Sequence, residues 1–160
     1  MTTTRRFLVL TALMFWLGGF MFYGAVVVPI VRETLPGPER STITRDVTAW
    51  MNLVGTIAVL VMFVDVWAGG SAARKWRWVA WLGMTLPLPL LVWLHGEMSR
   101  QMMEPGFHRT DIRPFLTWHR VYLLTNTAQW FAGMIFVALS LRAWRAEDSV
   151  MGSSQHNPGP

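Results

Sequence analysis

The chain has 160 residues, of which 52% are hydrophobic and only 14% are charged, and its formal net charge is +5. It contains no cysteine, which excludes disulfides, thiolate metal sites and thiol catalysis. The cations flank long apolar stretches, where membrane proteins place them against anionic headgroups. The positive charge therefore does not indicate nucleic-acid binding.

Four apolar runs dominate the sequence, and none carries a charge in its middle third. Each is long enough to cross about 30 Å of hydrocarbon, because an α-helix rises about 1.5 Å per residue. The sequence therefore predicts an all-α, polytopic membrane protein in contact with lipid, whose residues 1–145 form an antiparallel bundle of four transmembrane helices. The predicted spans are residues 7–31, 47–68, 76–96 and 114–142.

The first run has an alternative interpretation as an export signal, because Arg5 and Arg6 precede it as a charged leader would. However, the run is longer than the apolar region of a signal peptide, and no clear small-residue cleavage site closes it. We therefore expect it to be retained as a span.

Polar segments separate the spans, with a break expected at Pro36-Gly37-Pro38 and a disordered tail over residues 146–160. Lysine and arginine are equally numerous on the two sides of the predicted bundle, but they crowd the short connection before the third span. By the positive-inside rule, this density favours both termini in the cytoplasm, in a bacterial inner membrane.

The fourth span carries a polar face of five residues within a narrow arc of the helix: His119, Tyr122, Asn126, Gln129 and Gly133. Polar groups exposed to hydrocarbon would lack hydrogen bonds, so this face is expected to point into the bundle. It either lines a site for a cofactor, quinone or ion, or hydrogen-bonds to neighbouring helices.

Two prolines, Pro87 and Pro89, lie in the middle of the third span. Each removes a backbone donor, so the sequence predicts a kink that other helices or water must satisfy. The kink either shapes a cavity or is a local bend only.

Asp65 is an isolated carboxylate near the end of the second span. Arg74 and Arg77 follow in the next connection, and we expect one of them to form a structural ion pair with Asp65 at the membrane interface.

His95 and His119 are expected at similar depth on neighbouring helices, which is the arrangement that ligates a b-type haem. Alternatively, they combine with carboxylates and a histidine of the connecting segment to bind zinc or copper. The predicted metal set is His95, His108, His119, Glu97 and Asp111. A third interpretation makes both histidines interfacial residues that hydrogen-bond to carboxylates of the loop.

The first half of the chain contains three recognisable strings: Phe15-Trp16-Leu17-Gly18-Gly19, Val28-Pro29 and Trp50-Met51-Asn52-Leu53-Val54-Gly55. These strings resemble the copper-resistance-D-like family of small bacterial four-helix membrane proteins. The resemblance implies the four-helix architecture and assigns no activity.

Catalytic motifs are missing from the sequence, which has no glycine-rich phosphate loop, Gly-x-Ser-x-Gly elbow or His-Glu-x-x-His helix. The leading interpretation is a non-catalytic accessory subunit of an energy-converting or photosynthetic complex, packed against other membrane proteins or pigments. The alternative is a redox or ligand-binding protein that holds a b-type haem, a metal ion or a quinone near His95 and His119, with Tyr122, Asn126 and Gln129 in the same site. A transporter or a membrane enzyme is the third possibility.

Overall fold

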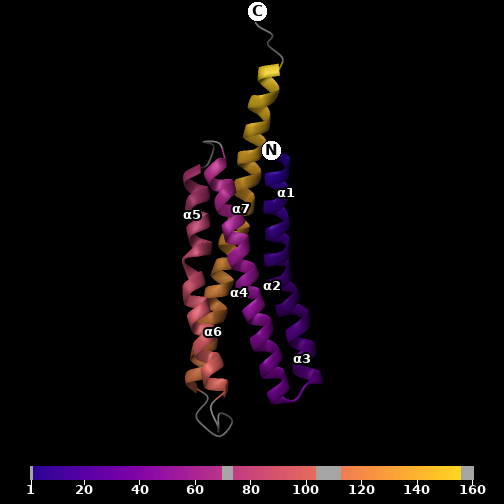
Figure 1. The fold of residues 1–160 in the computed structure, drawn as a ribbon, viewed down its shortest axis with the longest axis vertical. Helices are drawn as coiled ribbons and strands as arrows, with labels where there is room; N and C mark the ends of the chain where they lie inside the picture. Colours follow the sequence, from indigo (N-terminus) through magenta and orange to yellow (C-terminus); the bar gives the residue numbers. More distant parts are fainter. Residues whose placement is uncertain (1, 70–73, 104–112, 156–160) are drawn as a thin grey trace, which may run out of the picture.

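A computed structural model describes residues 2–69, 74–103 and 113–155, and within these ranges all secondary structure is helical. Four helices are long and apolar enough to cross a membrane, which confirms the predicted all-α four-helix membrane protein. They run antiparallel, and both termini lie at the same end, here called the terminal end (Figure 1). The spans are Thr3–Thr34, Glu39–Ala68, Arg74–Met103 and Arg113–Met151.

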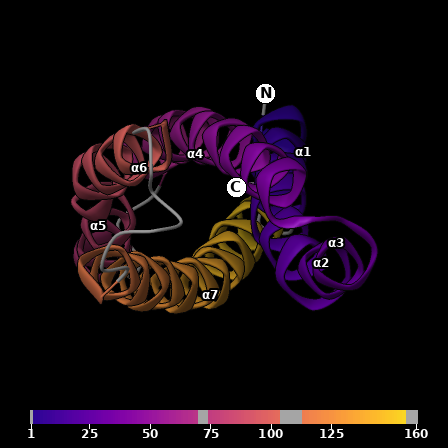
Figure 2. The ribbon, with the colours of Figure 1, turned by 90° about the horizontal axis from the view of Figure 1, so that it is seen from below.

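The first helix is continuous, but two π-helical turns interrupt its α-helical geometry. Its segments are α1 (Thr2–Leu13), η1 (Met14–Gly18), α2 (Gly19–Phe22), η2 (Tyr23–Val27) and α3 (Val28–Thr34). Each π turn shifts the helical register, so the faces before and after it point in different directions. Figure 2 shows α4, α5, α6 and α7 arranged around a common axis, with α2 and α3 on the outside of this group.

The second helix, α4 (Gly37–Ala68), begins well before the predicted start at residue 47. The break expected at the Pro-Gly-Pro string is present, because Leu35 and Pro36 are extended. The rest of the predicted polar connection is helical, since Pro38 lies in the first turn of α4, where its fixed φ suits a helix start. An apolar run predicts only the part of a helix that lies in hydrocarbon, and α4 continues beyond that part.

The third helix is broken as the prolines predict, into α5 (Arg74–Thr85) and α6 (Pro87–Met103). Leu86 joins them, and its N–H still donates to the carbonyl of Leu82 at 2.9 Å. Pro87 and Pro89 have no N–H, so two carbonyls of the last turn of α5 lose their helical donors.

The fourth helix, α7 (Arg113–Gln155), has Pro114 in its first turn, where the fixed φ of proline suits a helix start. It continues beyond residue 142 to Gln155, so residues 146–155 of the predicted tail are helical. The physical reason is that Glu147 and Asp148 form ion pairs with Arg6 of α1, which hold this part of the helix against the bundle. Residues 156–160 lie outside the described residues.

The main core joins the first half of helix one to the other helices, with Val9, Leu13, Trp16 and Leu17 all buried. Glycine permits the closest approaches. A Cβ on Gly55 would lie 2.7 Å from Nε1 of Trp16, and a Cβ on Gly133 would lie 3.0 Å from Cδ2 of Leu17. Gly133, on the polar face of the fourth span, therefore lets the first helix approach closely.

Candidate functional site

A buried carboxylate at the terminal end is held by two arginines. Asp65 of α4 and Arg77 of α5 are both 0% exposed and form an ion pair, and Arg5 of α1 places Nε 2.9 Å from Oδ1 of Asp65. The predicted structural ion pair of Asp65 is confirmed with Arg77, whereas Arg74 is exposed. Three helices are therefore tied together at one carboxylate.

The environment of Arg77 explains why this pair persists. Its guanidinium lies over the ring of Phe136 on α7, 5.7 Å from the ring centroid. Removal of water makes an unpaired charge cost several kcal/mol, so burial is tolerated only when cation and anion are neutralised together.

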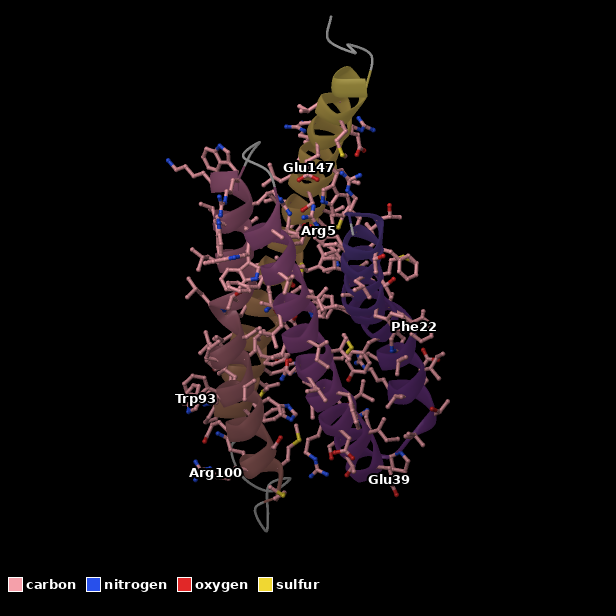
Figure 3. The ribbon with its side chains drawn as sticks, turned by 45° about the horizontal axis from the view of Figure 1, so that its top comes forward. Arg5, Phe22, Glu39, Trp93, Arg100 and Glu147 are labelled. Atoms are coloured by element: carbon pink, nitrogen blue, oxygen red, sulfur yellow. The ribbon has the colours of Figure 1, made fainter. Side chains whose placement is uncertain are left out.

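A second set of charged residues lies next to this pair and connects it to α7. Glu147 Oε2 accepts hydrogen bonds from Arg5 at 3.2 Å and from Arg6 at 3.0 Å. Arg6 also lies 2.9 Å from Asp148 and donates to the carbonyl of Trp144 at 3.2 Å. Figure 3 shows Arg5 and Glu147 close together at this end.

We call this set the terminal charge cluster, and its six members contribute as many acids as bases. Its residues are Arg5, Arg6, Asp65, Arg77, Glu147 and Asp148. Of these contacts, the sequence predicted only the ion pair between Asp65 of α4 and Arg77 of α5. The sequence contains two further motifs of this cluster: the Arg-Arg pair near the start of the chain and the Glu-Asp pair after the fourth span. Because the number of spans is even, these two pairs lie on the same side of the membrane.

The polar face of α7 points into the bundle, as predicted. Tyr122 is 5% exposed and donates to Oδ1 of Asn52 on α4 at 3.1 Å. Gln129 is 1% exposed and donates from Nε2 to the carbonyl of Met84 at 2.6 Å, within the last turn of α5 before the proline break. These are interhelical hydrogen bonds, and the one from Gln129 reaches a carbonyl in the turn next to the proline break.

Two buried polar atoms near Tyr122 have no hydrogen-bond partner within the described part of the chain. They are Nδ2 of Asn52 and the hydroxyl of Tyr23 on η2. Buried donors without partners are uncommon in folded proteins, so each calls for an explanation. Asn126, one turn further along α7, is half-buried.

The two predicted haem ligands have separate neighbours. His95 of α6 is half-buried, within electrostatic range of Arg45 and Asp46 on α4. His119 stacks on Phe115 of its own helix, with ring centroids 6.0 Å apart and an interplanar angle of 8°. No ring contact or hydrogen bond of the described residues joins the two imidazoles, and haem ligation by them stays a prediction.

The predicted metal set is described only in part, because His108 and Asp111 lie outside the described residues. Glu97 accepts hydrogen bonds from Arg100 at 2.8 Å and from Gln101 at 3.0 Å, both on its own helix. In the described ranges, no three histidine or acidic side chains come together as metal ligands. The interpretation as a zinc or copper site therefore stays a prediction that involves the connection after α6.

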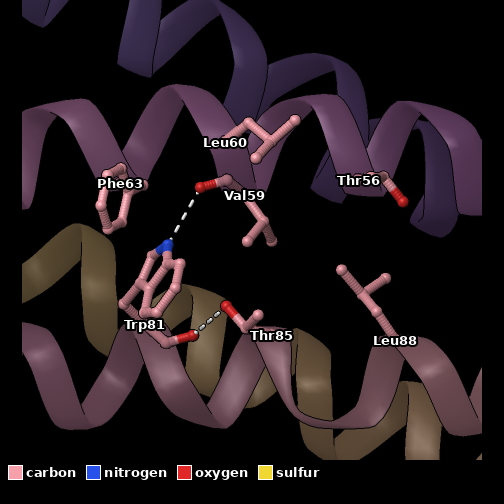
Figure 4. A pocket seen from close by; sticks show the side chains of 7 residues that line it. All are labelled: Thr56, Val59, Leu60, Phe63, Trp81, Thr85 and Leu88. Atoms are coloured by element: carbon pink, nitrogen blue, oxygen red, sulfur yellow. Dashed lines mark hydrogen bonds between the residues drawn. The ribbon is translucent and has the colours of Figure 1, made fainter.

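An apolar groove of about 300 Å³ lies between α4 and the broken third helix (Figure 4). The indole of Trp81 donates to the carbonyl of Val59 at 2.9 Å, and the hydroxyl of Thr85 donates to the carbonyl of Trp81 at 2.8 Å. The polar groups of these side chains are thus bonded to backbone, which leaves a surface suited to hydrocarbon. The lining residues are Thr56, Val59, Leu60, Phe63, Trp81, Thr85 and Leu88.

Fold and sites together define a small integral membrane protein built as a four-helix bundle. A family model described as "Domain of unknown function (DUF4149)" matches residues 11–104, and the chain belongs to this family. The matched segment includes the contact of Trp16 with Gly55 and the pair of Asp65 with Arg77, while α7 follows it. No curated protein and no solved structure matches the chain. The resemblance to copper-resistance-D-like proteins stays a prediction.

Proposed function

We propose that this membrane protein is a non-catalytic accessory subunit, packed against the transmembrane helices of other proteins in an energy-converting or photosynthetic complex. One observation carries the proposal: α2, η2 and α3 bury no side chain. Five of their large apolar side chains are exposed instead, namely Met21, Phe22, Val26, Val28 and Ile30, and Phe20, Val27 and Val31 are half-buried.

Membrane helices associate chiefly through close packing, because lipid tails are as apolar as the side chains they replace. The second half of the first helix buries no side chain within its own chain, and α2 and α3 lie outside the group formed by α4, α5, α6 and α7 (Figure 2). A Cβ on Gly18 or Gly24 would meet no atom within 4 Å, so the helix backbone is open to a neighbour at these positions. These features fit a surface completed by a partner helix.

Site-specific photocrosslinking in the native membrane tests this proposal. A photoreactive residue at Phe22 or Val26 is expected to give a discrete protein adduct. Val92 of α6 is 53% exposed and serves as the matched lipid-facing control, from which only lipid adducts are expected. Lipid adducts alone from all three positions would contradict the proposal.

A second candidate function is the binding of a lipid-soluble ligand such as a quinone. The supporting observation is the pair of unpartnered buried donors, Nδ2 of Asn52 and the hydroxyl of Tyr23, on neighbouring helices. Both would donate to a carbonyl oxygen. Protein purified from its native membrane in mild detergent should then retain a quinone, and the Asn52→Leu variant should lose it.

An absorption spectrum of the same preparation, oxidised and dithionite-reduced, tests the haem and pigment alternatives. A Soret band with a reducible α-band that His95→Ala and His119→Ala both abolish would favour a haem protein. Pigment bands would favour a photosynthetic assembly, and a spectrum with neither feature would count against both.

A further inference from the structure

Three polar side chains join the first helix to α4 and α7 within the apolar spans. Tyr23 begins η2, Asn52 lies on α4, and Tyr122 of α7 lies within electrostatic range of Tyr23. Gly19 lies one turn before Tyr23, and a Cβ on it would lie 3.7 Å from Sδ of Met51. The first helix therefore packs on α4 next to Asn52. We call these three side chains, Tyr23, Asn52 and Tyr122, the polar node.

The hydrogen bond of Tyr122 fixes which end of the Asn52 amide is free. The Tyr122 hydroxyl donates to Oδ1 of Asn52 at 3.1 Å, so Nδ2 is the end of the amide that remains for another partner. Nδ2 of Asn52 and the hydroxyl of Tyr23 are buried, and neither has a hydrogen-bond partner among the described residues. An amide nitrogen can only donate, and a tyrosine hydroxyl donates as well. The polar node therefore offers two donors to an acceptor from outside the chain.

The position of the polar node favours an acceptor that is soluble in lipid. Tyr23 and Asn52 lie in apolar spans, and both side chains are half-buried, so a ligand in the bilayer can reach them. Hydrocarbon itself provides no acceptor, and a donor left unpaired there costs free energy. A carbonyl oxygen has two lone pairs and can accept from both donors at once. In addition, π-helical turns such as η2 are frequent at functional sites.

We propose that the polar node binds the oxidised form of a quinone, with one ring carbonyl accepting from Nδ2 of Asn52 and from the hydroxyl of Tyr23. This inference rests on the second candidate function, quinone binding, and adds the redox state that the site selects. A hydroquinone carries a hydroxyl in place of the carbonyl, and its proton competes with the two donors. Tyr122 is a positioning residue, because its hydrogen bond leaves Nδ2 rather than Oδ1 for the ligand.

The test titrates the full chain in detergent micelles with decylubiquinone and, without oxygen, with its hydroquinone. The wild type should bind the oxidised form about fivefold more tightly, as one additional neutral hydrogen bond would give. Tyr23→Phe should weaken binding of the oxidised form about fivefold for the same reason. Tyr122→Phe frees the amide to rotate, so the two redox forms should then bind about equally. A merely structural role of Tyr122 would lower both affinities alike.

The matched control is Thr56→Val, one turn from Asn52 on α4. The hydroxyl of Thr56 already donates to the backbone carbonyl of Asn52 at 2.8 Å, so both affinities should stay unchanged. Infrared spectra with an isotope-labelled quinone identify the acceptor, because the carbonyl stretch of the bound quinone should move to higher frequency in Tyr23→Phe. A change in the ester carbonyl band of added phospholipid instead would identify a lipid as the occupant and overturn the proposal.

Two results separate a failure of this inference from a failure of quinone binding itself. Equal binding of the two redox forms by the wild type, or tighter binding of the hydroquinone, would overturn only the proposed selectivity. No binding of either form would overturn the second candidate function as well, and would assign the two free donors to water.

Discussion

The two halves of the first helix share one apolar run but have opposite environments. The first half anchors Arg5 and Arg6 in the terminal charge cluster and buries Trp16 against Gly55, whereas the segments after Gly18 bury nothing. Hydrophobicity does not separate the two, because lipid and protein interior are both apolar. Glycine contacts and paired charges distinguish the half that is held by its own chain.

The largest expected effect comes from Asp65→Asn, which leaves two arginines without their shared counter-ion. Loss of one partner of a buried ion pair costs about 3–5 kcal/mol of the free energy of unfolding, which SDS titration of the micellar protein would measure. The matched control is Asp46→Asn, an exposed partner of Arg45 on the same helix, with an expected change below about 1 kcal/mol.

The double variant Asp65→Leu/Arg77→Met sharpens this prediction. Removal of both charges should recover most of the lost stability, since apolar replacements of buried ion pairs are often neutral. Similar losses for Asp65→Asn and Asp46→Asn would show that the terminal charge cluster does not hold the helices together.

The addition of a single methyl group should distinguish the two halves of the first helix. A Cβ at Gly55 of α4 tests the packing of the first half, and a Cβ at Gly24 tests that of the second half. In Gly55→Ala the new Cβ meets the rigid indole of Trp16, so we expect a loss of about 1–3 kcal/mol in the free energy of unfolding. In Gly24→Ala the Cβ meets nothing, and the change should be neutral or stabilising by up to about 1 kcal/mol. Comparable destabilisation of both variants would contradict the comparison.

The polar face of α7 should show a smaller effect. Gln129→Leu removes the donor to the Met84 carbonyl, and interhelical hydrogen bonds in membranes contribute about 0.6 kcal/mol on average and up to about 1.7. Asn126→Leu on the same face is the control, expected to leave the free energy of unfolding within about 0.5 kcal/mol. A greater loss at Asn126 would point to a ligand or partner at that position.

The smallest effect is expected for Phe22→Ala in the second half of the first helix. This side chain is 60% exposed, so its truncation should change the unfolding of the purified chain by less than about 0.5 kcal/mol. In the native membrane, the same variant should weaken co-purification of a crosslinked partner. A stability loss above about 2 kcal/mol would show that the segment packs within its own chain.

Much of the architecture was predictable from particular residues. The four apolar runs predicted the spans, Pro87 and Pro89 predicted the break, and the arc of α7 predicted the burial of Tyr122 and Gln129. The helix ends were less predictable, because polar residues beyond the hydrocarbon form helix when they cap or pair. Such pairing explains why α7 continues past Glu147.

The candidate sites were predictable only where one helix face carried the signal. The contact of Tyr122 with Asn52 joins residues 70 positions apart, and that of Arg6 with Glu147 joins residues 141 apart. No periodicity within a helix encodes such pairings. For His95 and His119, the sequence predicted a similar depth in the membrane. It did not predict that His119 stacks on Phe115 of its own helix.

The sequence by itself determined that this chain is a four-helix membrane protein, because the cost of exposing backbone to lipid permits little else for such apolar runs. It also determined the break in the third helix, since proline lacks an N–H wherever it lies. Only the tertiary structure decided which side of each helix is covered by its own chain and which charged side chains form the terminal charge cluster. Those outcomes depend on packing and ion pairing between segments that are distant in the sequence. Lipid competes with this packing, because lipid tails are as apolar as the side chains that pack.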